Sequence, residues 1–157
     1  MQTAYIHSPL GITRITGDEN GVTEISVRNE EQPPTAKIPK TLQEAAKQLA
    51  EYFDGKRTEF TFKLNPQGTE FQQRVWQELR SIPFGKTVSY MDITKKLGDI
   101  KAIRAVASAN GKNPLWIVVP CHRVIGTDGS LTGYAGGLWR KKWLLEHETP
   151  SMQQSLF

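Results

Sequence analysis

Cysteine is nearly absent from this chain, since Cys121 is its single cysteine among 157 residues. One thiol excludes an internal disulfide, a CxxC redox pair and a zinc site built on several cysteines. Long apolar runs are also missing, because no stretch approaches the roughly 18 residues of a membrane-spanning helix. Residues 1–10 lack the basic start and apolar centre of a signal peptide. A lone thiol fits a reducing compartment, so we expect a cytoplasmic protein with no membrane segment.

The composition that is present favours a folded globular chain. Hydrophobic residues make up 38% and charged residues 23%, and the length fits one ordinary domain or two small lobes. Charge is uneven, because residues 1–68 have a net charge of −1 and residues 69–157 of +5. A basic half attracts acidic polymers such as DNA or RNA, although an excess of this size also fits an ordinary solvated surface.

Residues 1–68 predict a small α+β lobe. Apolar residues lie in three short extended runs that are separated by turn sequences at residues 8–11 and 18–21. Runs of this length with glycine-containing turns are typical of antiparallel strands. The first third of the lobe is therefore expected to form a three-stranded meander.

A helix and a further strand are expected next. One helical face of residues 41–53 would carry the apolar side chains, namely Leu42, Ala45, Ala46, Leu49 and Phe53. Residues 60–64 alternate between apolar and polar side chains, which predicts a strand. Residues 65–68, with one proline and one glycine, are read as the linker that ends the lobe.

Residues 69–150 predict a second, mostly helical lobe. Apolar spacing favours a first helix at residues 69–79. Ser89 and Asp92 have the spacing of a capping box, in which the serine accepts from the amide of Asp92 and the aspartate reaches back. This pair would start a short helix that ends at Gly98.

A second short helix, residues 101–110, would follow with Asp99 as its cap. Two short helices joined by a tight glycine turn have the pattern of a helix-turn-helix, although many such pairs are plain packing elements. The second helix is rich in small residues, namely Ala102, Ala105, Ala107, Ser108 and Ala109. Small side chains would let a helix approach the narrow minor groove of DNA, and they would equally suit close helix–helix packing.

The run PCHRV at residues 120–124 follows the apolar residues 115–119. A thiolate is the reactive form of cysteine, and positive charge next to it lowers the pKa of the thiol. The run therefore fits an activated nucleophile. Free cysteines also commonly fill space in a core, and the spacing alone leaves both interpretations open.

Several motifs together resemble the O6-alkylguanine-DNA alkyltransferases, also called methylated-DNA–protein-cysteine methyltransferases. The resemblance covers residues 69–148 and is weaker over residues 1–68. Its motifs are FQQRVW at 71–76, IPFGKTVSY at 82–90, RAV at 104–106, NP at 113–114, IVVPCHRV at 117–124, GYAGG at 133–137 and WLLEHE at 143–148.

The resemblance implies DNA repair by direct reversal. A methyl or other alkyl group would pass irreversibly from O6-alkylguanine, and from O4-methylthymine, to Cys121, so each molecule would act once. The damaged nucleotide would first be flipped out of the duplex by a helix-turn-helix bound in the minor groove. The resemblance also implies a ribonuclease-H-like first lobe, no cofactor or metal ion, alkylated double-stranded DNA as partner, and a monomer without an obligatory protein partner.

Family roles transfer residue by residue onto the matching positions. Cys121 is the expected acceptor, and His122 would take the thiol proton through a water. Glu148 would orient this imidazole, and Asn113 would order the turn around the thiol. Tyr90 would help to push the nucleotide out and would donate a hydrogen bond or proton to the guanine leaving group.

Other positions are expected to contact DNA or the flipped base. Arg104 would fill the vacated place in the base stack. Further DNA contacts are expected from Lys101, Ala102, Ala105, Arg123 and Tyr90. The base pocket would be formed by Tyr134, Ala135, Gly136 and Val124, with alanine at position 135 where some relatives have serine.

Some features carry no special function in this interpretation. Arg140, Lys141 and Lys142 are expected to form a solvated helix face, with a smaller chance of touching phosphate. Tryptophans 76, 116, 139 and 143 are expected in the core rather than as stacking platforms for bases. Residues 151–157 are expected to be a flexible tail.

Two alternatives from other functional classes stay open. A lesion-recognition module would bind alkylated duplex while Cys121 only fills the core, so its mass would not change. A cysteine hydrolase or acyltransferase would use Cys121 and His122 for repeated turnover, although the chain has no nucleophile elbow.

The predicted role of Arg104 gives a first test. Extrusion of a nucleotide costs a few kcal/mol, so removal of the side chain that fills the stack should shift the equilibrium against the extruded state. We expect Arg104→Ala to lose several-fold of the extrusion signal from a duplex with a fluorescent base analogue. An unchanged signal would rule this role out.

Overall fold

The computed structural model describes residues 1–131, 133–134 and 136–149. The chain forms two compact units. The first comprises residues 1–67 with 114–116, and the second comprises residues 68–113 with the described residues from 117 onward. Within these described ranges, no helix combines the length and the apolar character needed to cross a membrane. Position 135 and the predicted tail 151–157 lie outside the described residues.

The first unit is built on an antiparallel sheet of strands β1 (Gln2–Ser8), β2 (Gly11–Asp18) and β3 (Gly21–Arg28), in that order. Ala4, Ile15 and Ile25 lie opposite one another in the register and are at most 1% exposed. Because side chains alternate between the two faces of a strand, these residues define the core face. The predicted meander is confirmed.

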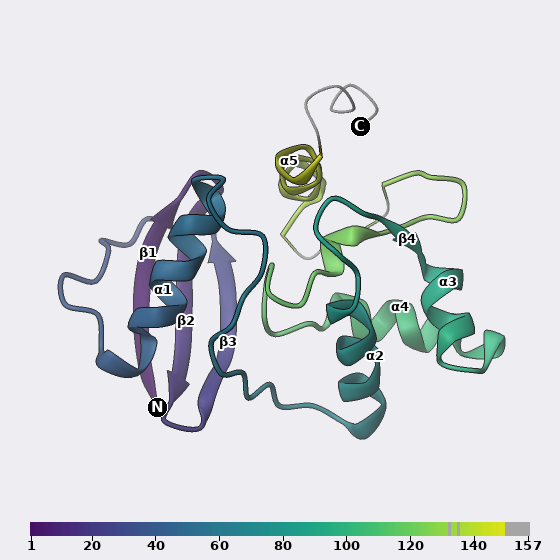
Figure 1. Cartoon of the computed structure of the whole chain (residues 1–157), viewed down its shortest axis with the longest axis horizontal. Coiled ribbons are helices and arrows are strands. Elements are labelled where there is room, and N and C mark those ends of the chain that lie inside the picture. Colours follow the sequence, from purple (N-terminus) through teal and green to yellow (C-terminus); the bar gives the residue numbers. More distant parts are fainter. Residues whose placement is uncertain (132, 135, 150–157) are drawn as a thin grey trace. The chain divides into compact units, whose positions relative to one another are not determined.

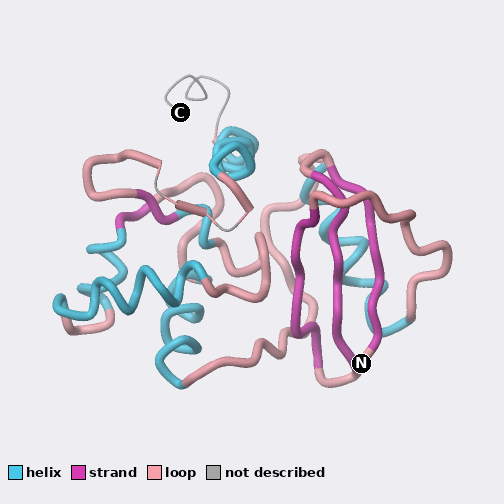
Figure 2. The backbone as a smooth tube through the Cα atoms, turned by 180° about the vertical axis from the view of Figure 1, so that it is seen from behind, coloured by secondary structure: helices cyan, strands magenta, loops and turns pink. Residues whose placement is uncertain are grey.

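Helix α1 (Lys40–Phe53) covers the core face of this sheet, and Figure 2 shows the three strands side by side with the helix behind them. The predicted helix is confirmed, with one correction to its buried face. Tyr52 is fully buried, whereas Phe53 is only half-buried and its ring centroid lies 6.1 Å from that of Trp116. In the last turn of the helix, the ring of Tyr52 and not that of Phe53 enters the core.

The strand predicted at residues 60–64 does not form. Phe60 stacks near Tyr52 at 5.6 Å and Phe62 at 6.0 Å between ring centroids, so aromatic packing rather than strand pairing holds this stretch. A single bridge joins Leu64 to Val22 of β3. Farther along β3, the backbone of Ile25 bonds to Pro114 and Trp116. Each of these two distant stretches thus makes a single bridge to β3. In the parallel register of the first bridge, the residues before Leu64 fall opposite the turn between β2 and β3, so no strand extends there.

The second unit is mainly helical (Figure 1). Short two-residue strands β4 and β5 pair in parallel in this unit. Its elements are α2 (Glu70–Arg80), β4 (Val88–Ser89), α3 (Tyr90–Lys96), η1 (Ile100–Ala102), α4 (Ile103–Gly111), η2 (Cys121–Arg123), β5 (Val124–Ile125) and α5 (Leu138–Glu148), where η1 and η2 are 3₁₀ turns. The α+β class predicted from the sequence is confirmed.

Helices α2 and α3 both begin with complete capping boxes. Ser89 accepts from the amide of Asp92 at 3.0 Å, and the Asp92 carboxylate accepts from the amide of Ser89 at 2.9 Å. Thr69 and Gln72 make the same reciprocal pair at α2. The capping box predicted for Ser89 is confirmed, because two orphan amides at a helix start are satisfied by neighbours three residues apart.

Helices α3 and α4 form the predicted helix-turn-helix pair, with Gly98 in the left-handed region between them. The α-helix begins at Ile103 rather than Lys101, because the Asp99 side chain caps the 3₁₀ turn η1 that precedes it. Val106 and Ala109 of α4 are buried, whereas Ala105, Ala107 and Ser108 are exposed. The exposed small residues therefore form a smooth outer surface and do not serve helix packing.

The indole of Trp76 joins α2 to α4, since its Nε1 donates to the carbonyl of Ala109 at 2.9 Å in a buried setting. We expect Trp76→Phe to destabilise the fold by about 1–2 kcal/mol, because the substitution removes a buried hydrogen bond and part of a buried ring, while the carbonyl of Ala109 keeps only the amide of Lys112 as donor. Urea unfolding measures the change. Trp139→Phe is the matched control, because Trp139 is 58% exposed and should leave stability nearly unchanged. Equal stabilities of wild type and Trp76→Phe would contradict the prediction.

Candidate active site

The stretch that leads to the cysteine has an unusual backbone. Ile117 is 1% exposed and has a φ of +72°, a left-handed conformation that a β-branched residue rarely adopts. The Asn113 side chain donates from Nδ2 to the carbonyl of Val119 at 2.7 Å. Burial and this hydrogen bond together hold the strained turn, as strain of this kind persists only where the surroundings enforce it.

Cys121 begins the 3₁₀ turn η2, and its side chain is 8% exposed. Cys121 and His122 therefore lie in a turn after Pro120 and not on opposite faces of a strand. Residues 121–123 are all buried in consequence, with His122 at 0% and Arg123 at 6% exposed.

The imidazole of His122 bonds to the last residue of α5. Its Nε2 lies 2.7 Å from Oε2 of Glu148, and both side chains are buried. The other ring nitrogen, Nδ1, is buried and has no hydrogen-bond partner within the described part of the chain. The geometry is that of a base oriented by a carboxylate, with one nitrogen left to receive a proton.

The same carboxylate is also held by Arg123. Nε of Arg123 donates to Oε1 of Glu148 at 2.7 Å, and NH2 donates to Oε2 at 3.0 Å. This bidentate pair is the geometry in which arginine holds a carboxylate most firmly. We therefore correct the prediction that Arg123 contacts DNA: at 6% exposure, with these donors turned inward, its guanidinium belongs to the interior of the site.

Residues 82–85 enclose this ion pair. The carbonyl of Ile82 accepts from NH1 of Arg123 at 2.7 Å, and the guanidinium carbon lies 5.9 Å from the centroid of the Phe84 ring. Gly85 has a φ of +82°, and a β-carbon there would lie 3.1 Å from the carbonyl oxygen of Glu148. Three residues of the IPFG motif therefore have a structural role. The Ile82 carbonyl accepts a hydrogen bond, the Phe84 ring contacts the guanidinium, and Gly85 allows a close backbone approach. The sequence alone assigned none of these roles.

Charges in the site set the resting protonation states. Burial alone would raise the pKa of Glu148, but the His122 ring and the Arg123 guanidinium hold that pKa well below its ordinary value. Burial lowers the pKa of His122, although Glu148 opposes the shift, and the positive charge of Arg123 lowers it further. At neutral pH the carboxylate is therefore ionised and the imidazole is neutral, the state a general base requires.

The thiol does not have the lowered pKa expected from its neighbours in sequence. Burial raises the pKa of Cys121, and this outweighs a hydrogen bond from Asn113, the positive charge of Lys141 and a hydrogen bond from Tyr134. The guanidinium of Arg123, which was expected to lower the pKa of the thiol, is bonded to Glu148 instead. Because the resting thiol is protonated, alkyl transfer by this thiol needs a base.

Lys141 and Arg140 correct the expected solvated helix face. Lys141 is fully buried and its Nζ donates to the carbonyl of Val124 at 2.7 Å, while Arg140 is 5% exposed. Lys142 is exposed, as predicted. The sequence contained a signal for Lys141, because it precedes Leu144, Leu145 and Glu148 by three, four and seven positions and so shares their helix face.

Other predicted site residues lie as follows. Tyr90 is the first residue of α3 and follows Ser89, which pairs with Ile125 just beyond the cysteine turn. Val124 is 1% exposed beside the same turn. Tyr134 is near enough to the thiol to lower the pKa of Cys121, and Gly136 packs against the Tyr134 ring, whereas Ala135 lies outside the described residues.

The residues predicted to contact DNA differ in their exposure. Lys101, Arg104 and Ala105 are exposed, and Ala102 is half-buried. The tryptophans divide: Trp76 and Trp116 are core residues, as predicted, but Trp139 is 58% exposed, which contradicts the expectation of a core position. Trp143 is half-buried and stacks on His147 at 4.8 Å between centroids.

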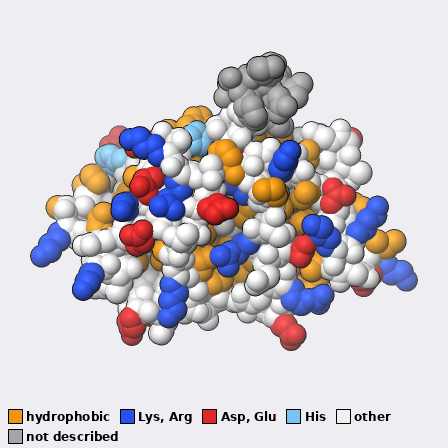
Figure 3. Space-filling model, viewed as in Figure 1, with side chains coloured by type: hydrophobic (Ala, Val, Ile, Leu, Met, Phe, Trp, Pro, Cys, Tyr) orange, Lys and Arg blue, Asp and Glu red, His pale blue; other side chains and the backbone are white. Residues whose placement is uncertain are grey.

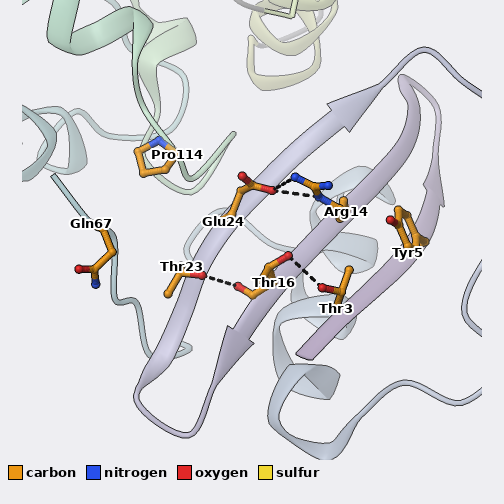
Figure 4. Close-up of a pocket in the computed structure, with 8 residues that line it drawn as sticks. All are labelled: Thr3, Tyr5, Arg14, Thr16, Thr23, Glu24, Gln67 and Pro114. Carbon is orange, nitrogen blue, oxygen red and sulfur yellow. Dashed lines mark hydrogen bonds and ion pairs between the residues drawn. The ribbon is translucent and has the colours of Figure 1, made fainter. Parts of the chain in front are cut away.

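A hollow of about 640 Å³ lies on the face of the sheet opposite α1 (Figure 4). Its hydroxyl groups are largely engaged, since Thr3 bonds with Thr16, and Thr23 donates to the Thr16 carbonyl. Arg14 pairs with Glu24 in the same hollow. None of the lining side chains is a thiol or an imidazole, so we place the chemistry at Cys121 and not here.

The low pKa of His122 predicts how stability responds to acid. As pH falls through the ordinary histidine pKa of about 6.5, His122 binds a proton in the unfolded chain but stays neutral in the folded protein, where its pKa is lowered. The unfolding free energy therefore falls with pH in this window. Urea unfolding between about pH 7.5 and 5.5 should show a steeper loss for the wild type than for His122→Gln. Parallel curves would mean that folded His122 has an ordinary pKa.

Family comparisons agree with this site. The description "6-O-methylguanine DNA methyltransferase, DNA binding domain" matches residues 70–150, and "6-O-methylguanine DNA methyltransferase, ribonuclease-like domain" matches residues 1–66. The ribonuclease-like character expected of the first lobe is thereby confirmed.

Curated relatives are similar over nearly their whole length. A methylated-DNA–protein-cysteine methyltransferase of Methanosarcina acetivorans is 44% identical over 153 residues, which cover 94% of this chain and 98% of that protein. A protein of the same name from Mycobacterium tuberculosis is 45% identical over 147 residues, covering 91% of this chain and 89% of its own length.

Solved structures of proteins with these names are also similar to this chain. The Mycobacterium tuberculosis OGT in complex with DNA matches with a TM-score of 0.86 and 42% identity, covering 98% of both chains. An O6-methylguanine DNA methyltransferase from Methanococcus jannaschii matches with a TM-score of 0.68 and 30% identity, covering 92% of both. With the buried thiol, imidazole and carboxylate in one site, these matches show that the chain belongs to the 6-O-methylguanine DNA methyltransferase family.

Proposed function

We propose that this chain repairs DNA by moving the alkyl group of O6-alkylguanine to Sγ of Cys121. DNA is the partner, and the enzyme is a methyltransferase whose acceptor is its own cysteine. The observation that carries the proposal is the buried His122, whose Nε2 is held by Glu148, while Nδ1 has no hydrogen-bond partner among the described residues.

The reaction begins with the proton of the thiol. Because burial raises the pKa of Cys121, the resting sulfur is a poor nucleophile until its proton leaves. A bridging water passes this proton to Nδ1 of His122. The ionised Glu148 then stabilises the imidazolium through Nε2, as the carboxylate does in a catalytic triad.

Displacement follows at the alkyl carbon. A bond forms from Sγ to that carbon as the carbon–O6 bond breaks, and the electron pair of the broken bond goes to O6 of guanine. The developing negative charge on the base is met by a proton or hydrogen bond from the Tyr90 hydroxyl. The thioether that remains has no good leaving group, so each molecule acts once.

Two features of the site stabilise the ionised form of the Cys121 thiol. Lys141 places a positive charge within reach of the sulfur and lowers the pKa of Cys121 against the effect of burial. Hydrogen bonds from Asn113 and Tyr134 act in the same direction. These groups are fixed before the reaction, so they favour the thiolate without costly reorganisation.

Helices α3 and α4 are the DNA-binding pair in this proposal. Ala105, Ala107 and Ser108 form an exposed surface of small side chains, which suits close approach to the minor groove. Lys101 and Arg104 are exposed at the start of the same region. On the face drawn in Figure 3, Lys and Arg side chains are dispersed among acidic and neutral groups rather than gathered in one patch.

Arg104 replaces the extruded nucleotide in the base stack, and Tyr134, Gly136 and Val124 receive the damaged base. O4-methylthymine is a second substrate in the proposal, since it presents an alkylated oxygen to the same thiol. We expect a monomer that acts without a protein partner. The lone thiol fits the reducing conditions of the cytoplasm, where we expect the protein to work.

Intact-mass measurement tests the proposal against both alternatives. After incubation with a duplex that contains one O6-methylguanine, the wild type should gain one methyl group per molecule, located on Cys121. Cys121→Ala should gain none, while it still binds the duplex. Bound DNA with no mass gain in the wild type would instead indicate a recognition module, and many lesions cleared per molecule would indicate a turnover enzyme.

A further inference from the structure

Arg140 is a buried cation that contacts the segment between Tyr134 and helix α5. Its NH1 donates to the carbonyl of Gly136 at 2.9 Å, and its side chain is nearly inaccessible at 5% exposure. Burial of a guanidinium is costly unless its donors are used. The bond to Gly136 is one such use, and it joins α5 to a residue just beyond Tyr134.

Gly136 fits tightly between two side chains. A β-carbon at this position would lie 3.2 Å from Cε2 of Tyr134 and 3.4 Å from Cδ of Arg140. The first distance is closer than a real β-carbon tolerates without movement of its neighbour. The Tyr134 ring and the Arg140 side chain therefore both pack against the position where a side chain of residue 136 would begin.

Backbone hydrogen bonds tie the same residues together. The amide of Gly137 donates to the carbonyl of Tyr134 at 2.9 Å, and the amide of Arg140 donates to the carbonyl of Gly137 at 3.1 Å. The Tyr134 side chain also lowers the pKa of the Cys121 thiol, so it lies near the sulfur. A short series of neighbouring residues thus leads from Arg140 through Gly136 and Tyr134 toward the reacting sulfur.

The indole of Trp139 packs against the guanidinium. The guanidinium carbon of Arg140 lies 4.4 Å from the centroid of the indole, a cation–π distance. Trp139 is itself 58% exposed, whereas Arg140 is 5% exposed. The exposed ring therefore supplies part of the surroundings that bury Arg140.

We propose that Arg140 is a positioning residue that holds Gly136 and Tyr134 in the geometry the damaged base requires, and that Trp139 shields it. This inference rests on the proposed alkyl transfer to Cys121. Arg140 acts through its neighbours and does not touch the reacting atoms. Its loss should reduce the rate of transfer within the bound complex, while the affinity for DNA stays the same.

The test separates rate from binding. Single-turnover transfer from an O6-methylguanine duplex is followed by intact mass over a range of duplex concentrations, which gives a maximal rate and a half-saturating concentration. Fluorescence anisotropy on the unmodified duplex gives an independent Kd. Thermal unfolding is recorded for every variant. The variants are Arg140→Ala, Arg140→Lys, Trp139→Ala and Lys142→Ala.

We expect Arg140→Ala to lower the maximal rate by about tenfold to a hundredfold, because a misplacement of about 1 Å in a reacting site has effects of this size. The Kd should stay within about twofold, a change of about 0.4 kcal/mol. Arg140→Lys should recover part of the rate, since its ammonium can donate to Gly136 but lacks the planar stack on Trp139. Trp139→Ala should lower the maximal rate by less. Lys142→Ala removes an exposed cation from the same helix and should match the wild type.

Three results would overturn the inference. The first is a wild-type maximal rate in Arg140→Ala. The second is loss of folded structure in both Arg140 variants, which would make the residue part of the fold alone. The third is a raised Kd with an unchanged maximal rate in Trp139→Ala, which would place the indole on DNA. If the wild type itself gains no methyl group, the proposed function fails instead, and the variants are not needed to show it.

Discussion

One carboxylate, that of Glu148, determines how the site is organised. It is buried at the end of α5 and is bound by both His122 and Arg123. A buried charge needs strong compensation, and the bidentate guanidinium supplies it. With Arg123 as the cation of the pair, the imidazole has no need to be charged. Glu148 can therefore be ionised while His122 stays neutral and able to accept a proton.

The raised pKa of the thiol suits a protein that reacts once. A thiolate is open to oxidants and to stray alkylating agents, and each such event would consume a molecule without repairing a lesion. Burial keeps the Cys121 sulfur protonated at rest. Lys141, Asn113 and Tyr134 are already in place to favour the charged form when a base removes the proton. Burial thus protects the resting thiol, whereas the Asn113 and Tyr134 dipoles and the Lys141 cation favour its ionised form.

Much of the fold followed from local patterns. The meander of residues 2–28, helix α1, the capping box at Ser89 and the glycine turn at Gly98 depend on neighbours a few residues apart. Such interactions are written in short stretches of sequence, and their prediction succeeded. The strand expected at residues 60–64 failed because a strand needs an extended partner. In the parallel register of the Leu64–Val22 bridge, the residues before Leu64 lie opposite the turn that precedes β3.

The sequence by itself determined that the chain has one reactive thiol in a family-specific run, next to a histidine and in a basic helical half. It also placed Glu148 among the site residues through its motif. Only the tertiary structure decided which charges enter the interior. Arg123, Arg140 and Lys141 look like surface cations in sequence, yet each is buried. For Arg123 and Lys141 the reason is that their partners come from other segments: Glu148 lies 25 positions from Arg123, and the carbonyl of Val124 lies 17 positions from Lys141. Arg140 instead bonds to the carbonyl of Gly136, four positions away. Burial of a charged side chain is decided by the partner that compensates it, and for Arg123 and Lys141 no local pattern in the sequence identifies that partner.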